Sequence, residues 1–248
     1  MAIPKIVHLC WFGGGPMSAT VQSCLRSIHT LNSHGYEVRL WNESNYDVTA
    51  SPLVHEHHQH RRWALVSDYA RLDLLHKYGG IYLDTDVEVV KPFDELLNSD
   101  FFIGFMWDCT LGTAVLGSVP GHWIVADLLE QYDRDPATLK PPNNNTFTEY
   151  FLKRVPGFAL NGKAQNVKGV AILGKYAFEQ PSFLSRLNYT IHHFEQSWHT
   201  SSQTKARVKA LVIKLFSLWL YRKYVCWRSL RISPFYEAFK RVHAEAPP

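Results

Sequence analysis

Two carboxylates in the first half of the chain are the residues best placed to do chemistry. Asp84 and Asp86 follow the apolar run 81–83, which predicts a short buried strand. Successive side chains of a strand alternate between its faces, so these two carboxylates are expected on the same side. Paired carboxylate oxygens at the carboxyl end of a strand suit a divalent cation that also takes phosphates as ligands. The spacing therefore indicates a site for a nucleotide diphosphate.

The element before these acids must position them. Residues 63–78 show apolar side chains at three- and four-residue steps, which predicts a helix, and Gly79 and Gly80 predict its end. Asp68 and Arg71 are three residues apart and share one face of this helix. They are either an exposed ion pair of little consequence for stability or a pair at the edge of a cleft that holds the nucleotide.

The start of the chain predicts an α/β domain. A strand is expected over residues 3–11, a glycine loop over 13–16, a helix over 20–31 and a second strand over 36–41. This β-α-β order is typical of a parallel sheet. No Gly-Lys-Ser/Thr follows the glycines, so a P-loop is not supported. At 248 residues and 46% hydrophobic composition, the chain can bury one sizeable core, alone or with an appendage.

Five ordered segments carry a resemblance to a known family. Ser-Asp-x-x-Arg at 67–71 and Tyr-Gly-Gly-Ile-Tyr-Leu-Asp-Thr-Asp-Val at 78–87 resemble the signature of DXD-type sugar transferases, glycosyltransferase family 32. The segments at 3–11, 91–97 and 191–198 match the same family in order. That family includes bacterial capsular polysaccharide enzymes and yeast mannosyltransferases, and the catalytic core of clostridial glucosylating toxins is a distant relative. The resemblance covers residues 3–198.

The resemblance implies a fold and a reaction. The expected fold is α/β, with a GT-A-like, Rossmann-type mixed sheet flanked by helices. The expected reaction is metal-dependent transfer of a sugar from a nucleoside-diphosphate sugar, with a UDP-sugar favoured, to an acceptor hydroxyl. Mn²⁺ or Mg²⁺ would serve as the cation, and the anomeric configuration would be retained by front-face displacement. The expected acceptor is a glycan or glycolipid in bacterial surface polysaccharide (capsule) or glycolipid assembly.

The same resemblance implies roles for particular residues. Catalytic roles are implied for Asp84, Asp86 and Arg71. Metal ligands are implied at Asp84, Asp86, His192 and Glu195. The nucleotide sugar would contact Trp11 at the base, Tyr82 at the ribose, Asp68 and Arg71 at the sugar hydroxyls, and Asp84, Ser197 and Trp198. His192 and His193 face opposite sides of a strand, and the family pattern favours His192 for the site.

Three further segments have weaker interpretations. The histidines at 55, 57, 58 and 60 could suggest a metal site, but a solvated helix start is the better interpretation because ligands need convergent geometry. The run 143–146 is either an acceptor loop or a plain polar loop. Residues 110–114 lack an Asn that relatives often carry there, which puts the donor-sugar and acceptor contacts in doubt.

Charge divides the chain into two parts. Residues 1–198, the expected catalytic domain, have a net charge of −4, whereas residues 199–248, an aromatic-rich helical extension, have a net charge of +8. Such an extension could lie on an anionic membrane surface or pack on the core. Nucleic-acid binding is not favoured, because no recognised module accompanies the basic patch.

The composition is typical of a cytoplasmic protein. The basic extension adds the hypothesis that the protein attaches peripherally to the inner face of the cell membrane. No signal peptide opens the chain, no run reaches the length of a membrane span, and the four cysteines are scattered without metal or redox spacing. The sequence also allows two other functions, the first of which uses the same carboxylates. One is a metal-dependent phosphoester or nucleotide-sugar hydrolase, and the other is a non-catalytic scaffold that docks on membranes.

Overall fold

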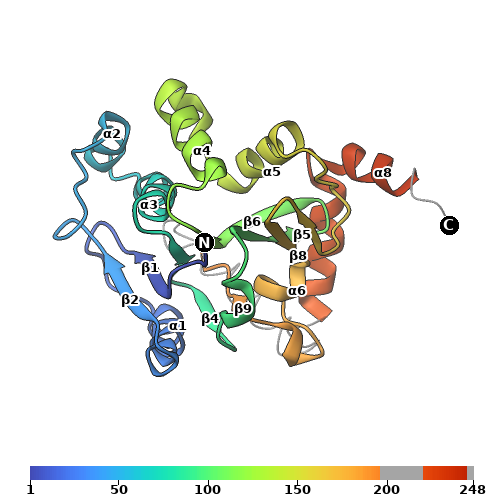
Figure 1. Ribbon diagram of the computed structural model, residues 1–248, viewed down its shortest axis with the longest axis horizontal. Helices are drawn as coiled ribbons and strands as arrows, with labels where there is room; N and C mark the ends of the chain where they lie inside the picture. The colour runs from blue at the N-terminus through green and yellow to red at the C-terminus, as the bar shows by residue number, and fades with distance from the viewer. Residues whose placement is uncertain (196–219, 245–248) are drawn as a thin grey trace, which may run out of the picture.

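The computed structural model describes residues 1–195 and 220–244 of the chain. Among these residues, seven strands form one mixed sheet at the centre of the molecule (Figure 1). Their spatial order is β2 (Glu37–Trp41), β1 (Ile6–Cys10), β3 (Gly80–Leu83), β6 (Thr110–Ser118), β5 (Phe101–Trp107), β8 (Val170–Leu173) and β7 (Gln165–Val167). A separate antiparallel pair joins β4 (Val87–Val89) to β9 (Thr190–His192).

The β-α-β start predicted from the sequence is confirmed. Strand β1 runs parallel to β2 on one side and to β3 on the other, so the carboxyl ends of all three lie at one edge of the sheet. Helix α1 (Ala19–His29) connects β1 to β2, and the Ser18 hydroxyl caps it by accepting from the Val21 amide. A 3₁₀ helix (Thr30–His34) continues it to Gly35, whose φ of +78° ends the turn.

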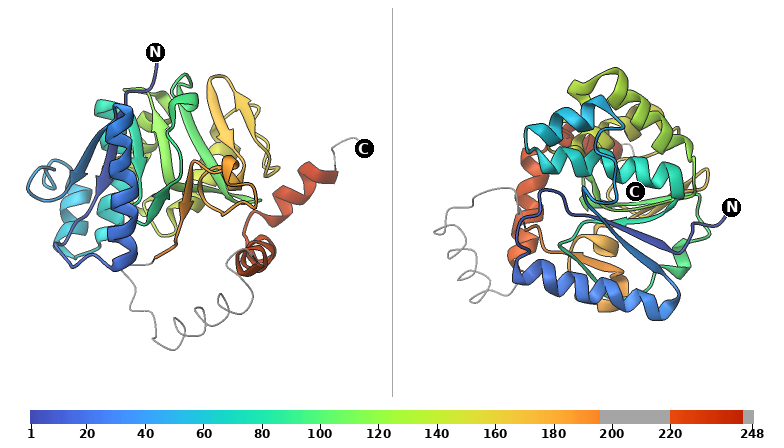
Figure 2. Two further views of the ribbon diagram at one scale, coloured as in Figure 1. Left: turned by 90° about the horizontal axis from the view of Figure 1, so that it is seen from below. Right: turned by 90° about the vertical axis from the view of Figure 1, so that its left-hand side faces the viewer.

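Helices cover both faces of the sheet (Figure 2). One face packs against α2 (Pro52–Gln59), α3 (Trp63–Tyr78), α4 (Trp123–Arg134) and α5 (Asn143–Arg154). The other face packs against α1, α6 (Lys175–Phe178) and the β4–β9 pair. Each face has its own apolar core, and fully buried phenylalanines such as Phe105 and Phe102 contribute roughly 1.5–3 kcal/mol apiece. The predicted α/β fold, a mixed sheet flanked by helices, is confirmed.

The junction between α3 and β3 depends on two glycines. The helix ends at Tyr78, as predicted, and Gly79 and Gly80 then adopt φ values of +62° and +100°. A Cβ at Gly80 would lie 2.5 Å from the carbonyl oxygen of Ile6, so only glycine allows β3 to pair this closely with β1. The two glycines therefore bring the start of β3, and the acids after it, against the N-terminal strand.

The shorter elements complete the chain. Three further 3₁₀ turns occur at Asp94–Leu96, Pro136–Thr138 and Ser185–Leu187. Residues 220–232 are helical, and α8 (Tyr236–Ala244) follows.

The described part of the basic extension packs on the sheet domain. Leu230, Phe235 and Phe239 contact the core on the α3–α5 side, and the Ser233 hydroxyl lies 3.4 Å from that of Thr110 in β6. Residues 199–219, which hold four of the ten Lys and Arg side chains of the extension, lie outside the described residues, as does the expected domain boundary at 198. In the described ranges, no helix has both the length and the apolar character that crossing a membrane requires.

Candidate metal centre

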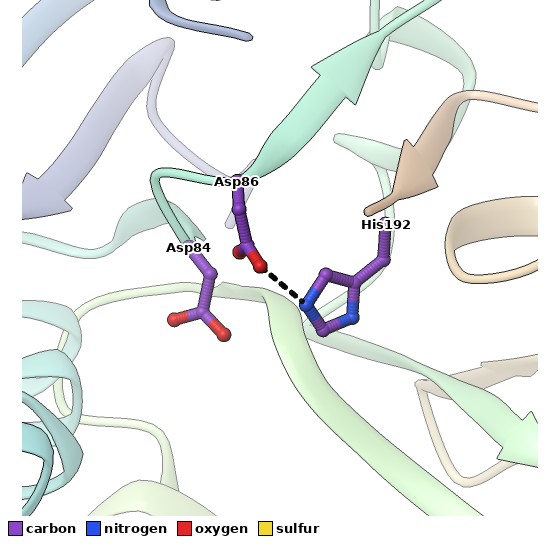
Figure 3. Close-up of side chains that lie close together, drawn as sticks. All are labelled: Asp84, Asp86 and His192. Atoms are coloured by element: carbon purple, nitrogen blue, oxygen red, sulfur yellow. Dashed lines mark ion pairs between the residues drawn. The ribbon is translucent and has the colours of Figure 1, made fainter. Parts of the chain in front are cut away.

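The two acids are brought together by a turn, not by strand alternation. Strand β3 ends at Leu83, Asp84 follows it, Thr85 and Asp86 form a turn, and β4 begins at Val87. The Val87 amide donates to the Asp84 carbonyl at 3.1 Å and closes this turn. The expectation that both acids extend one strand was therefore wrong, although their convergence was predicted correctly (Figure 3).

His192 joins the two acids from the far end of the chain. Strand β9 pairs antiparallel with β4 so that His192 lies opposite Val87, the residue after Asp86. The His192 Nε2 atom lies 3.3 Å from Asp86 Oδ2, and one ligand atom each from Asp84, Asp86 and His192 lies within 4.8 Å of the others. His193 points elsewhere and pairs with the half-exposed Glu88 at 2.9 Å. The structure thus places His192, and not His193, at the site.

A buried carboxylate that the sequence did not reveal lies behind His192. Glu179 is 1% exposed, and its Oε2 atom lies 2.7 Å from His192 Nδ1. A Cβ at position 112 would collide with the Glu179 carboxylate, so Gly112 of β6 makes the room for it. A carboxylate on the second ring nitrogen is the usual way to fix the orientation of a metal-binding imidazole. The only signal in the sequence was one acid at the end of the apolar run 176–178.

The charges of His192 and Asp86 depend on the groups that contact them. Burial lowers the pKa of His192, but the Glu179 and Asp86 carboxylates on either side outweigh it and raise this pKa to about 10. Burial raises the pKa of Asp86, yet His192 and the Glu195 amide hold it below its ordinary value. A cation at this position would replace the proton on Nε2 as the partner of Asp86.

Asp68 and Arg71 form a buried pair behind Asp84. Their side chains are 11% and 6% exposed and meet at 2.7 Å, and the Arg71 guanidinium also lies 3.4 Å from Asp84 Oδ1. Arg71 donates to the Thr113 carbonyl of β6 at 2.7 Å as well. The interpretation as an exposed ion pair is therefore wrong. Burial outweighs the attraction of Arg71 and raises the pKa of Asp68 to about 6.

Tyr82 and Trp11 occupy different environments. Tyr82 is 1% exposed, its hydroxyl donates to Asp84 Oδ1 at 2.8 Å, and its ring lies 4.6 Å from the guanidinium carbon of Arg71. It thus positions Asp84, and its contact with a ribose stays a prediction. Trp11 follows β1 at the same sheet edge as Asp84, half-buried, and its indole N–H donates to the Gly15 carbonyl.

The glycine loop after Trp11 lines a cavity of about 560 Å³, the larger of two described for this molecule. None of the three residues of the acid–histidine cluster lines it. The base-stacking role of Trp11 stays a prediction.

The closing motif is only partly described. Glu195 was expected as a metal ligand, but its carboxylate accepts from the Ser18 hydroxyl at 2.8 Å, at the start of α1. Its backbone amide instead donates to Asp86 Oδ2 at 2.7 Å and holds that carboxylate in place. The Glu195 carboxylate is therefore not part of the Asp84–Asp86–His192 cluster in this structure, and its role as a metal ligand stays a prediction. Ser197 and Trp198 lie outside the described residues.

Other segments differ from their sequence interpretation. His55, His57 and His58 belong to a separate helix, α2, which His60 follows, and His57 is buried at 6% exposure, so the segment is not a solvated helix start. Residues 143–146 form the first turn of α5 and not a loop, and Asn144 Oδ1 accepts from both the amide and the hydroxyl of Thr113.

The residues of the cluster fit a divalent cation. Two carboxylates and one imidazole converge from the β3–β4 turn and β9, and none of the three side chains is more than a quarter exposed. Carboxylate oxygens suit Mg²⁺ and Mn²⁺, and an added imidazole nitrogen shifts the preference toward transition metals such as Mn²⁺. With water and phosphate oxygens in the remaining positions, such an ion would bind a diphosphate at the sheet edge.

Comparison with known proteins finds a similar family over part of the chain. Residues 18–103, which include Asp68, Arg71, Asp84 and Asp86, match the family described as the glycosyltransferase sugar-binding region containing the DXD motif. This part of the chain is therefore similar to the DXD-type sugar-binding region, in agreement with the resemblance that its motifs carry.

Among similar proteins, inositol phosphoceramide mannosyltransferase 1 of Schizosaccharomyces pombe is 32% identical over 108 residues, which are 41% of this chain and 33% of that protein. An uncharacterized glycosyltransferase of Acanthamoeba polyphaga mimivirus is 25% identical over 66% of this chain and 69% of its own length. The chain thus spans about a third of the mannosyltransferase it matches. A solved structure, PaToxG Glycosyltransferase, superposes with a TM-score of 0.48 at 17% identity, over 63% of this chain and 70% of that one.

Proposed function

We propose that this protein transfers a sugar from a nucleoside-diphosphate sugar to an acceptor hydroxyl. The observation that carries this proposal is the convergence of Asp84, Asp86 and His192 at one sheet edge. Two of these residues belong to the matched DXD region, and the third comes from outside it and completes a donor set for a divalent cation.

Each residue of the site has a task that follows from its contacts. Asp84, Asp86 and His192 would hold Mn²⁺ or Mg²⁺, which when bound neutralises the charge that develops on a departing diphosphate. Tyr82 and Arg71 hold Asp84 from behind, and the Glu195 amide and His192 hold Asp86. Such fixed partners keep the carboxylates in position without reorganisation during the reaction.

We also propose retention of the anomeric configuration. The transition state has oxocarbenium character, and a retaining enzyme needs either a carboxylate nucleophile or a front-face displacement. Glu179 and Asp68 are buried and engaged with His192 and Arg71, so neither is presented to a substrate carbon. Front-face displacement, which the family resemblance implies, is therefore the mechanism that we propose.

For the donor and the acceptor we propose chemical classes and no single compound. A UDP-sugar is the favoured donor, and a mannose donor is included because one relative is named as a mannosyltransferase acting on inositol phosphoceramide. That relative favours a glycolipid acceptor over a soluble glycan. The proposed setting is bacterial surface polysaccharide or glycolipid assembly, with a cytoplasmic or membrane-peripheral location that cell fractionation would test.

The test is calorimetric binding of UDP-glucose, UDP-galactose and GDP-mannose to the purified chain with and without Mn²⁺. We expect one of them to bind only with the metal, and the Asp84→Ala/Asp86→Ala double variant to lose this binding. Folded wild-type protein that binds none of the three would contradict the proposal. Hydrolysis of the bound sugar without transfer to any of a broad acceptor panel would replace it with a hydrolase.

A further inference from the structure

One helix of the basic extension has two faces of different character. Residues 220–232 are helical and run beside α6 at the edge of the sheet domain (Figure 1). Arg222 and Cys226, four residues apart, are only 7% and 8% exposed, so this face packs on the sheet domain. Arg222 Nη2 donates to the His192 carbonyl at 2.7 Å. The helix is therefore held at a fixed position relative to the acid–histidine cluster.

The other face of this helix is exposed, although large apolar side chains lie along it. The exposed positions recur at three- and four-residue steps and form one stripe of the helix, the outer stripe. Its large apolar and aromatic side chains are between 49% and 72% exposed: Leu220, Tyr224, Trp227 and Ile232. Its other side chains are cations: Lys223, Arg228 and Arg231. The Arg231 guanidinium lies 4.3 Å from the Trp227 ring, so apolar and cationic groups are intermixed.

A loop beside the helix has the same character. Within residues 182–187, large apolar side chains are 88%, 48% and 48% exposed: Phe183, Leu184 and Leu187. Pro181, just before this loop, lines the same cavity of about 350 Å³ as Trp227, so the loop begins next to the helix. Large apolar side chains that gather in water mark an interaction site. The loop and the outer stripe together are called the apolar–cationic surface.

The charged groups of this surface are all cations. Between Glu179 and Glu237 the sequence contains nine Lys and Arg residues and one acidic residue, Glu195, whose carboxylate bonds to the start of α1. Asp108, the acidic residue in the wall of the adjoining cavity, is engaged by Lys175 at 2.6 Å. A partner that fits this surface must therefore offer negative charge directly beside apolar groups.

Of three candidate partners, an anionic lipid bilayer fits this surface best. A nucleic acid supplies phosphates but no apolar layer for aliphatic side chains such as Leu220 and Ile232. A second copy of the same surface would bring its cations against like charges. A bilayer presents phosphates next to acyl chains, so Trp and Tyr rings lie at the headgroup level while Arg and Lys reach the phosphates.

We propose that the apolar–cationic surface docks the protein on an anionic lipid bilayer. The apolar side chains of the helix and the loop enter the headgroup layer, and the arginines contact lipid phosphates. Packing on the core and lying on a membrane are then tasks of opposite faces of one helix. Because Arg222 bonds to the His192 carbonyl, docking also sets how the acid–histidine cluster is oriented above the bilayer. Presentation of a glycolipid acceptor there rests on the proposed function, whereas the docking does not.

The experiment is co-sedimentation of the full chain with lipid vesicles. One set of vesicles is phosphatidylcholine alone, and the other contains about one third phosphatidylglycerol. We expect binding only to the anionic vesicles, and weaker binding as NaCl rises from about 0.05 M to 0.5 M, because salt screens the attraction. No binding to the anionic vesicles at low salt, or equal binding to both sets, would overturn the proposal.

Charge reversal locates the cationic part of the surface. Arg228→Glu/Arg231→Glu changes two exposed side chains, so the variant should fold, and we expect at least about 30-fold weaker partition onto the anionic vesicles. Arg134→Glu/Lys153→Glu, at exposed positions of α4 and α5, changes the net charge by the same amount. This control should partition within about twofold of wild type. Equal losses in the two variants would mean that net charge alone, and not this surface, attracts the vesicles.

A tryptophan substitution tests the apolar part. Trp227 is 52% exposed, so Trp227→Ala should fold, and we expect about tenfold weaker partition. Trp123→Ala, at a 45% exposed tryptophan at the start of α4, is the matched control and should partition as wild type does. Unchanged partition of Trp227→Ala would contradict the docking surface. A dimer that Trp227→Ala separates in sedimentation velocity, in a protein that does not bind vesicles, would assign the surface to a second copy instead.

The outcomes for docking and for sugar transfer are separable. A protein that partitions onto anionic vesicles but binds no nucleotide sugar would keep the docking surface and lose the proposed transferase. A protein that binds a nucleotide sugar with Mn²⁺ but does not bind the vesicles would keep the transferase and lose the docking surface.

Discussion

Two buried histidines, one in each region of the molecule, are held in opposite charge states. His8 of β1 is fully buried, its Nε2–H donates to the Gly79 carbonyl at 2.8 Å, and its Nδ1 accepts from the Trp41 indole at 3.1 Å. Burial is the main cause that lowers the pKa of His8 to about 4. His192 is also shielded, but carboxylates on both ring nitrogens raise its pKa to about 10. Both histidines are buried, so the groups that contact each ring decide whether it is charged.

The difference separates a structural role from a ligand role. Both nitrogens of the neutral His8 ring are engaged, one as a donor to Gly79 and one as an acceptor from Trp41. The ring therefore holds β1 against the Gly79–Gly80 junction and has no lone pair free for a metal. His192 keeps one nitrogen toward the acids and gives the other to Glu179. The N-terminal region therefore builds the acid turn, and the C-terminal region supplies the proposed third ligand and its support.

The largest effect is expected at the acid turn. Asp86→Asn keeps the shape but removes the charge that faces His192, so we expect Mn²⁺ binding to be lost and sugar transfer to fall by about 10³-fold. Isothermal calorimetry with Mn²⁺ and a transfer assay measure the two effects. Asp73→Asn, on α3 where Asp73 pairs with Lys77, is the control. Full Mn²⁺ affinity in Asp86→Asn would remove the turn from the metal site.

A second large effect, on stability, is expected when the buried ion pair behind Asp84 is broken. Arg71→Ala leaves the buried Asp68 carboxylate without its partner, and we expect a loss of about 3 kcal/mol or more in the free energy of unfolding. Urea denaturation measures it. Lys153→Ala, which breaks an exposed pair with Glu149 on α5, should cost less than about 0.5 kcal/mol. Equal losses in both variants would contradict the structural role of the buried pair.

The C-terminal region offers a matched pair of carboxylates. Glu179→Gln weakens the hold on His192, so we expect Mn²⁺ affinity to fall by about 10–100-fold with the fold intact. Glu88→Gln changes the partner of the neighbouring His193, on the outer side of the same ladder, and should leave Mn²⁺ affinity unchanged. Electron paramagnetic resonance of free Mn²⁺ reads the affinity without an activity assay. Similar losses in the two variants would mean that Glu179 does not orient the ligand.

The smallest effect concerns the pH dependence that His8 produces. Its pKa is about 4 in the folded chain and 6.5 ordinarily, so the unfolded chain binds more protons between these values. Its contribution to stability is complete above pH 6.5 and is lost as the pH falls toward 4, by about 1 kcal/mol from pH 7 to 5.5. Urea denaturation of wild type and His8→Gln at pH 7 and pH 5.5 measures this contribution. It is the difference between the two proteins in how much the free energy of unfolding changes between these pH values. An NMR titration of the His8 ring in wild type decides the matter if the variant does not fold, since a midpoint near 6.5 would exclude the neutral buried state.

Local pattern predicted much of the N-terminal region. The helix Trp63–Tyr78 has the predicted bounds because its apolar spacing and the two glycines after it act within a few residues. The pairing of β1 with β2 followed from the β-α-β order. The strand expected to carry both acids ended early, at Leu83, because the Asp84 carbonyl accepts from Val87 and closes a turn. The helix α5 was missed because its first turn is rich in asparagine, a residue typical of loops.

What the sequence determined by itself is the set of short-range features: the acid motif, the helix that precedes it, the glycine junction and the resemblance to DXD-type sugar transferases that these carry. Each depends on side-chain periodicity or on backbone conformations open only to glycine, so neighbouring residues are enough to specify it. Only the tertiary structure decided that Glu179 supports His192, that Glu195 gives its amide and not its carboxylate, and that Arg222 reaches the His192 carbonyl. These contacts join segments far apart in the chain, and no local pattern records which buried polar group will meet which partner when the sheet and helices pack.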